Sequence, residues 1–152
     1  MSPRKTLLAL LAGLALGTPA LAQQARLSPP EIEAMAKGGA GAGTSGVAGI
    51  QTTVLLGDPT KAGPYTIEIR VPANTRIAAH THRDDRSAVV ISGTWYFGYG
   101  SVAGEPLTKA LPPGSFYTEP AADPHFAMTK GEPVVAYISG WGPTDTHFTA
   151  AH

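Results

Sequence analysis

The chain has 152 residues, of which 43% are apolar, so it is long and apolar enough for one folded domain with its own core. Lysine and arginine balance aspartate and glutamate at 11 each, which leaves no excess positive charge for nucleic acid phosphates or an anionic membrane surface. The absence of cysteine excludes disulfides, thiolate nucleophiles, cysteine-built zinc sites and iron–sulfur clusters. We therefore expect a small molecule or a second copy of the chain as partner, with no nucleic acid and no membrane anchoring.

The N-terminus has the pattern of an export signal. Arg4 and Lys5 precede an apolar run over 6–16, and the small residues Ala20 and Ala22 stand at positions −3 and −1 of a cleavage site. We predict a signal peptide over the first 22 residues, cleaved near Ala22, and a mature protein that is periplasmic or secreted. A membrane helix is the less favoured alternative, because a span needs roughly 18–20 apolar residues.

The segment 23–49 is expected to hold a short helix and a linker. Ser28 suits an N-cap, Pro29 the first helical position and Glu31 the third, which predicts a helix ending at about Lys37. Residues 38–49 contain six glycines and predict a flexible linker or a loose lid.

From Ile50 onward the pattern changes to short alternating strands separated by Gly/Pro turns. The expected strands are 50–56, 65–71, 76–82, 87–91, 94–99, 115–119, 125–129 and 134–140. Ser92-Gly93 predicts a hairpin between two of them. The fold class is therefore all-β, a sandwich or closed barrel over 50–141, with one short N-terminal helix and a C-terminal tail over 142–152 that has little pattern. Small barrels with exposed edges often pair, so we expect a homodimer.

The histidines carry the clearest chemical signal. His80 and His82 are two residues apart on an expected strand, so their imidazoles share one face and can chelate one metal ion. His125 begins another expected strand and is the candidate third ligand. On its own, a His-x-His pair is more often a polar surface feature, so the spacing around it has to decide.

The surrounding spacing matches the first motif of a known superfamily. That motif runs Gly, five residues, His-x-His, three or four residues, Glu, six residues, Gly. Here the positions are taken in order by Asn74, His80, His82, Arg86 and Gly93. Asn74 is a mild departure because asparagine tolerates the left-handed conformation that glycine usually supplies.

A second motif follows at the expected separation. It runs Gly, five residues, Pro-x-Gly, two residues, His, three residues, Asn. Here its positions are held in order by Gly114, Pro120, Ala122, His125 and Thr129. Ala122 is a mild departure if its φ is negative. With both motifs in order, residues 50 to 140 resemble the cupin superfamily.

The resemblance implies a double-stranded β-helix, or jelly-roll barrel, and one divalent metal ion held by His80, His82 and His125. Three-His cupins imply mononuclear iron, which is therefore the expected metal, with zinc, manganese or nickel as alternatives.

Arg86 is the serious departure, because a guanidinium cannot ligate a metal in the glutamate position. The ligand set becomes three histidines unless Asp84, Asp85 or Glu119 reaches in. Arg86 either faces the metal and binds an anionic substrate, or points away and pairs with Asp84 or Asp85 at the surface.

Aromatic residues complete the expected pocket. Trp95, Phe97 and Tyr99 share one face of their strand and Tyr96 lies on the other. Most of these rings belong in a barrel core, and we take Tyr96 as the candidate hydroxyl that binds substrate.

Three functions stay open at this point. The first is a three-His metal enzyme, a dioxygenase-type oxidoreductase acting on a small anion. The second is a non-catalytic binding or sensor domain with a structural metal, because fold does not determine function. In the third, the histidines line a barrel mouth without any metal.

Overall fold

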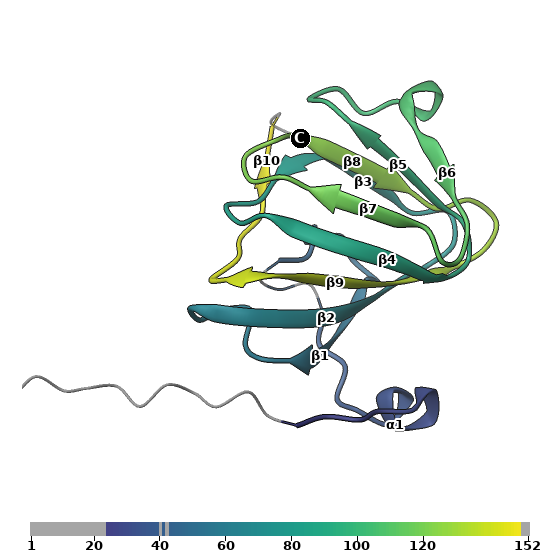
Figure 1. Cartoon of the computed structure of the whole chain (residues 1–152). Helices are drawn as coiled ribbons and strands as arrows, with labels where there is room; N and C mark the ends of the chain where they lie inside the picture. The colour runs from purple at the N-terminus through teal and green to yellow at the C-terminus, as the bar shows by residue number, and fades with distance from the viewer. Residues whose placement is uncertain (1–23, 40, 42, 150–152) are drawn as a thin grey trace, which may run out of the picture.

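The computed structural model describes residues 24–39, 41 and 43–149 (Figure 1). The predicted signal peptide and its cleavage site lie outside these residues. Within the described part of the chain, no helix has the length and apolar character needed to cross a membrane.

Strands are the main regular structure of the described residues, arranged as two five-stranded antiparallel sheets that face each other (Figure 1). One sheet has the order β1-β2-β9-β4-β7, and the other has the order β10-β3-β8-β5-β6. The elements are α1 (Pro29–Glu33), β1 (Gln51–Leu56), β2 (Gly63–Val71), β3 (Arg76–Thr81), β4 (Arg86–Ser92), β5 (Trp95–Tyr99), the 3₁₀ turn η1 (Glu105–Leu107), β6 (Lys109–Leu111), β7 (Phe116–Glu119), β8 (His125–Met128), β9 (Val134–Gly142) and β10 (His147–Phe148). This is the jelly-roll architecture that the sequence predicts.

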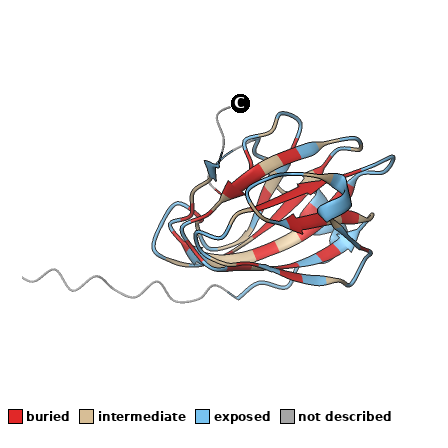
Figure 2. Cartoon of the chain, turned by 90° about the horizontal axis from the view of Figure 1, so that it is seen from above, coloured by how far each residue is buried: buried red, intermediate tan, exposed pale blue. Residues whose placement is uncertain are grey.

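The core lies between the two sheets. Ile67 and Val90 of the first sheet belong to the same buried cluster as Phe97 and Ala127 of the second. Figure 2 shows buried positions concentrated along the strands and exposed positions along the connecting loops. The alternation expected from the sequence is therefore the alternation between the inside and the outside of the barrel.

The predicted hairpin at Ser92-Gly93 is wrong. β4 pairs with β7 and β9, whereas β5 pairs with β6 and β8, so the turn passes the chain from one sheet to the other. Gly93 has φ +72°, and a Cβ there would lie 2.2 Å from the carbonyl oxygen of Pro133. The glycine thus serves a tight crossover between sheets.

The N-terminal and C-terminal ends also differ in detail from expectation. α1 begins with the expected capping box between Ser28 and Glu31 but ends at Glu33, before Lys37. The tail contains a short strand, β10, whose His147 and Phe148 pair with Thr81 and His80 of β3.

Candidate metal centre

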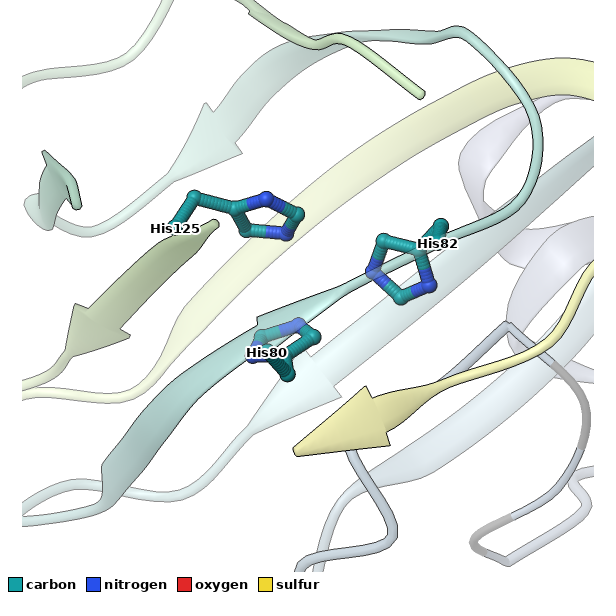
Figure 3. Close-up of side chains that lie close together, drawn as sticks. All are labelled: His80, His82 and His125. Carbon is teal, nitrogen blue, oxygen red and sulfur yellow. The ribbon is translucent and has the colours of Figure 1, made fainter. Parts of the chain in front are cut away.

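Three histidines, two on neighbouring strands and one directly after the first of these strands, meet inside the barrel (Figure 3). His80 lies on β3 and His125 on β8, and the two are direct partners across the strand pair. His82 follows β3 immediately. One ring nitrogen from each lies within 4.8 Å of the others, and the residues are only 5%, 1% and 1% exposed.

Each imidazole is held by its outer nitrogen. The Nδ1 atoms of His80, His82 and His125 donate to main-chain carbonyl oxygens, those of Ala78 at 2.7 Å, Asp145 at 2.5 Å and Asp123 at 3.2 Å. Since a carbonyl can only accept, each Nδ1 carries the proton and each Nε2 keeps its lone pair. The Nε2 atom of His125 is buried and has no hydrogen-bond partner. This is the tautomer and orientation that a metal-ligating histidine adopts.

The histidines are also kept neutral. Burial, together with the charge of neighbouring groups, lowers the pKa of His80 to about 4 and the pKa of His82 to about 3. Burial lowers the pKa of His125 as well. Neutral imidazoles are what a metal ion requires, so the residues present fit a divalent ion.

Arg86 points into this site. Its Nε donates to Oε2 of Glu119 at 2.5 Å, and its Nη2 contacts the same oxygen. Nη2 also lies 2.6 Å from Nε2 of His82, and Nη1 donates to the carbonyl oxygen of Gly43 at 2.6 Å. The alternative in which Arg86 pairs with Asp84 or Asp85 at the surface is wrong, because the residue is 5% exposed.

Glu119 is the acidic residue that reaches the histidines. Its Oε2 lies 3.8 Å from Nε2 of His82 and 3.7 Å from Nε2 of His125. Burial raises the pKa of Glu119, but the charge and hydrogen bonds of Arg86, together with His125 and His82, outweigh this effect and the pKa is lowered. The site therefore contains a carboxylate.

Asp84 and Asp85 have other partners. Asp84 accepts hydrogen bonds from the hydroxyls of Tyr65 at 2.8 Å and Thr144 at 2.6 Å. Asp85 accepts one from the backbone N–H of Ala121 at 2.8 Å. Both carboxylates stabilise the loops around the site.

The structure does not place Tyr96 at the histidines. Its ring lies under Nζ of Lys130, at 4.3 Å from the centroid, and borders a separate surface hollow. Tyr117 of β7 lines the histidine cavity in its place, and burial raises the pKa of its hydroxyl well above the usual value. Phe97 stacks on His125, with ring centroids 5.5 Å apart. The alternation of side chains along β5 correctly puts Tyr96 on the face opposite Phe97. It does not tell which of the two faces lines the inside of the barrel, and that face is the one with Phe97.

The cavity at the site is small. It is lined by His80, His125, Arg86 and Glu119, by apolar core residues and by the glycine-rich segment 43–45. Its free volume is about 30 Å³, room for one or two water molecules, roughly. Thr44 and Ser45 are 4% and 6% exposed, so this segment is packed into the barrel mouth. A larger ligand needs the segment to move.

No protein-family model and no curated protein matches the sequence. Solved structures do match. The polyketide cyclase RemF from Streptomyces resistomycificus shares 16% identity, covering 86% of this chain and 88% of its own, with a TM-score of 0.65.

Two further structures support the same fold. An RmlC-like cupin from Shewanella frigidimarina shares 13% identity over 79% of this chain and 92% of its own, with a TM-score of 0.58. The DMSP lyase DddQ from Ruegeria pomeroyi shares 19% identity over 61% of this chain, with a TM-score of 0.52, and this chain spans only 47% of the lyase. The chain therefore shares the double-stranded β-helix fold of these structures, the fold that the spacing of its two histidine motifs predicts.

Proposed function

We propose that this protein is a mononuclear metal enzyme that holds one divalent ion with His80, His82 and His125 and acts on a small anionic substrate. The observation that carries the proposal is the set of three buried imidazoles whose Nδ1 protons are fixed by main-chain carbonyls. Two solved structures of the same fold are named as enzymes, a polyketide cyclase and a DMSP lyase. Resemblance to three-His cupins favours iron and a dioxygenase-type reaction.

The side chains at the site have separable tasks in this proposal. Bound iron would supply redox chemistry, and zinc, manganese or nickel would supply Lewis acidity. Arg86 has five N–H groups, and its contacts with described residues use four of them, so one N–H of Nη1 can donate to an anion. Phe97 and Tyr117 border the cavity and make part of its wall apolar.

A non-catalytic binding or sensor domain is the second candidate. It is favoured by the cavity of about 30 Å³, which admits little beyond water while segment 43–45 stays in place. Replacing His82 by Ala separates the two roles of a metal. Loss of ligand binding with unchanged thermal stability supports a functional site, whereas loss of both metal and folding supports a structural one.

Elemental analysis of the untagged protein, wild type against His80→Ala, is the first test. Near-stoichiometric iron that is lost in the variant supports the proposal and leads to oxygen-uptake assays with small anions. Zinc, nickel or manganese supports hydrolysis, isomerisation or a structural role. No metal after reconstitution with each of these ions contradicts the proposed site.

Export and dimerisation are further parts of the proposal. Export is supported by the N-terminal pattern, and N-terminal sequencing of the mature protein tests it. A homodimer is supported by Phe116, which is 64% exposed on β7 at the edge of its sheet beside Val89. A monomeric sedimentation coefficient would contradict it.

A further inference from the structure

The residue that replaces the usual cupin glutamate has a glutamate directly beside it. Arg86 of β4 and Glu119 of β7 are partners across the antiparallel strand pair. They are 5% and 4% exposed, and both side chains line the histidine cavity. The carboxylate that is missing on β4 is therefore present on the adjacent strand, facing the same space.

The distances from Glu119 to two of the histidines, His82 and His125, are close to those expected around a shared ion. With metal–ligand bonds of about 2.0–2.2 Å, two donor atoms on one ion lie roughly 3 to 3.6 Å apart. Oε2 of Glu119 is 3.7 Å from Nε2 of His125 and 3.8 Å from Nε2 of His82. A shift of a few tenths of an ångström brings the oxygen to ligand spacing, which is within the reach of a side-chain torsion.

Charge balance in the buried site favours the carboxylate of Glu119 beside Arg86 and the histidines. Nη2 of Arg86 lies 2.6 Å from Nε2 of His82, on the lone pair that a metal ion needs. A divalent ion and a guanidinium enclosed together, with three neutral histidines, would place three positive charges in a poorly solvated site. Glu119 is the carboxylate in contact with both Arg86 and the histidines, and it removes one of these charges.

From this geometry we propose that Glu119 is a fourth ligand of the metal ion and that its carboxylate also balances the charge of Arg86. When the ion enters, Nη2 of Arg86 leaves Nε2 of His82 and keeps its contact with Glu119. The inference rests on the metal binding of the proposed function, and it adds a ligand from a strand that does not carry the usual acidic position.

Cobalt(II) is a suitable probe because its visible absorption reports the number and type of ligands independently of any activity. Its affinity is measured by competition with a chromophoric chelator, using full-length mature protein. Glu119→Gln should weaken cobalt binding about 100-fold and change the visible spectrum. Glu68→Gln is the matched control, because Glu68 is 2% exposed against 4% for Glu119 and is paired with Arg70 at 2.6 Å, but does not line the histidine cavity. It should leave affinity and spectrum unchanged.

A second pair of variants guards against a folding defect, since Glu119→Gln leaves Arg86 buried without its carboxylate. Arg86→Gln keeps the carboxylate and removes the competing guanidinium, so it should bind cobalt at least as tightly as wild type. The double variant Arg86→Gln, Glu119→Gln contains neither charge and should bind at least tenfold more weakly than Arg86→Gln.

The outcomes separate the inference from the proposed function. If the wild type binds cobalt and the double variant matches Arg86→Gln in affinity and spectrum, Glu119 is only the counter-ion of Arg86 and the inference fails alone. If the wild type binds neither cobalt nor any of the other candidate ions, the metal site and the inference fail together.

Discussion

At the scale of single residues, the turn between β7 and β8 contains an alanine in an unusual conformation. Ala122 stands in a motif position that is usually glycine, and its φ is +59°. Alanine would be a mild departure from glycine here only with a negative φ, and the observed φ is positive. The backbone N–H of Ala122 donates to the carbonyl oxygen of His82 at 2.8 Å, which requires this turn geometry. The strained backbone of Ala122 therefore lies at a hydrogen bond that helps to position His82.

Ala122→Gly should raise the free energy of unfolding by about 0.5–1 kcal/mol. The left-handed conformation costs a non-glycine residue roughly 1–2 kcal/mol, and the entropy of glycine in the unfolded chain offsets part of this gain. Urea denaturation measures the change. Ala121→Gly is the control, because Ala121 is also exposed but has no positive φ, and it should be neutral or destabilising. Equal destabilisation by both variants would contradict the argument.

The residues of the site differ in how far the sequence could predict them. His80, His82 and His125 could be grouped because strand alternation and motif spacing are local patterns. The direction of Arg86 could not, since its partner Glu119 is brought opposite only by the register of β4 against β7. The tyrosine at the cavity is Tyr117 and not the candidate Tyr96, because alternation separates the faces of a strand without saying which one the other sheet covers.

At the scale of elements, residues 43–45 form a strap that is held across the barrel mouth by hydrogen bonds. The carbonyl oxygen of Gly43 accepts from Nη1 of Arg86, and that of Thr44 accepts from the hydroxyl of Thr146 at 2.6 Å. The sequence predicted a flexible linker or loose lid from composition alone. Composition describes the freedom of the backbone, but it does not contain these two long-range contacts.

Gly43→Ala should loosen this strap. Gly43 has φ +79°, and a Cβ there would lie 2.6 Å from Cγ2 of Thr144. Gly46→Ala is a matched control, since Gly46 has φ +71° but nothing within 4 Å of the added Cβ. Both variants carry the same backbone cost, so the difference between them isolates the clash.

The measurement is the rate at which a chelator removes cobalt from each variant. Gly43→Ala should release the ion several-fold faster than Gly46→Ala, because the barrel mouth opens more often. Equal release rates would mean that segment 43–45 does not control access to the histidines.

The turn after β4 shows a general limit of local patterns. Ser92-Gly93 was identified correctly as a turn, yet the strands on either side enter different sheets. Hairpin signals describe the turn itself. Here β4 is hydrogen-bonded along its two edges to β7 and β9, and both partners are distant from it in the sequence.

At the scale of the whole molecule, the site is assembled from distant parts of the chain. β3 supplies His80, β8 supplies His125, and the loop before β10 supplies the carbonyl of Asp145 that orients His82. These groups lie on or next to strands β3, β8 and β10 of one sheet, and opening that sheet separates them. The unfolded chain therefore offers no preformed ligand set, and metal binding should be linked to global stability.

Metal should consequently stabilise the native protein by mass action. At a free cobalt concentration of about 100 times the Kd, the added free energy of unfolding is about 2.7 kcal/mol. For a domain of this size that corresponds to a rise in Tm of roughly 5–10 °C, measured by circular dichroism with and without the ion.

His80→Ala should lose the shift and Glu68→Gln should keep it, since Glu68 lies outside the cavity. A shift that persists in His80→Ala would place the ion elsewhere, for example at the exposed His147 beside Asp145. No shift in the wild type at saturating cobalt would mean that the ion binds native and unfolded chains equally, and the assembled histidine centre would then not be the binding site.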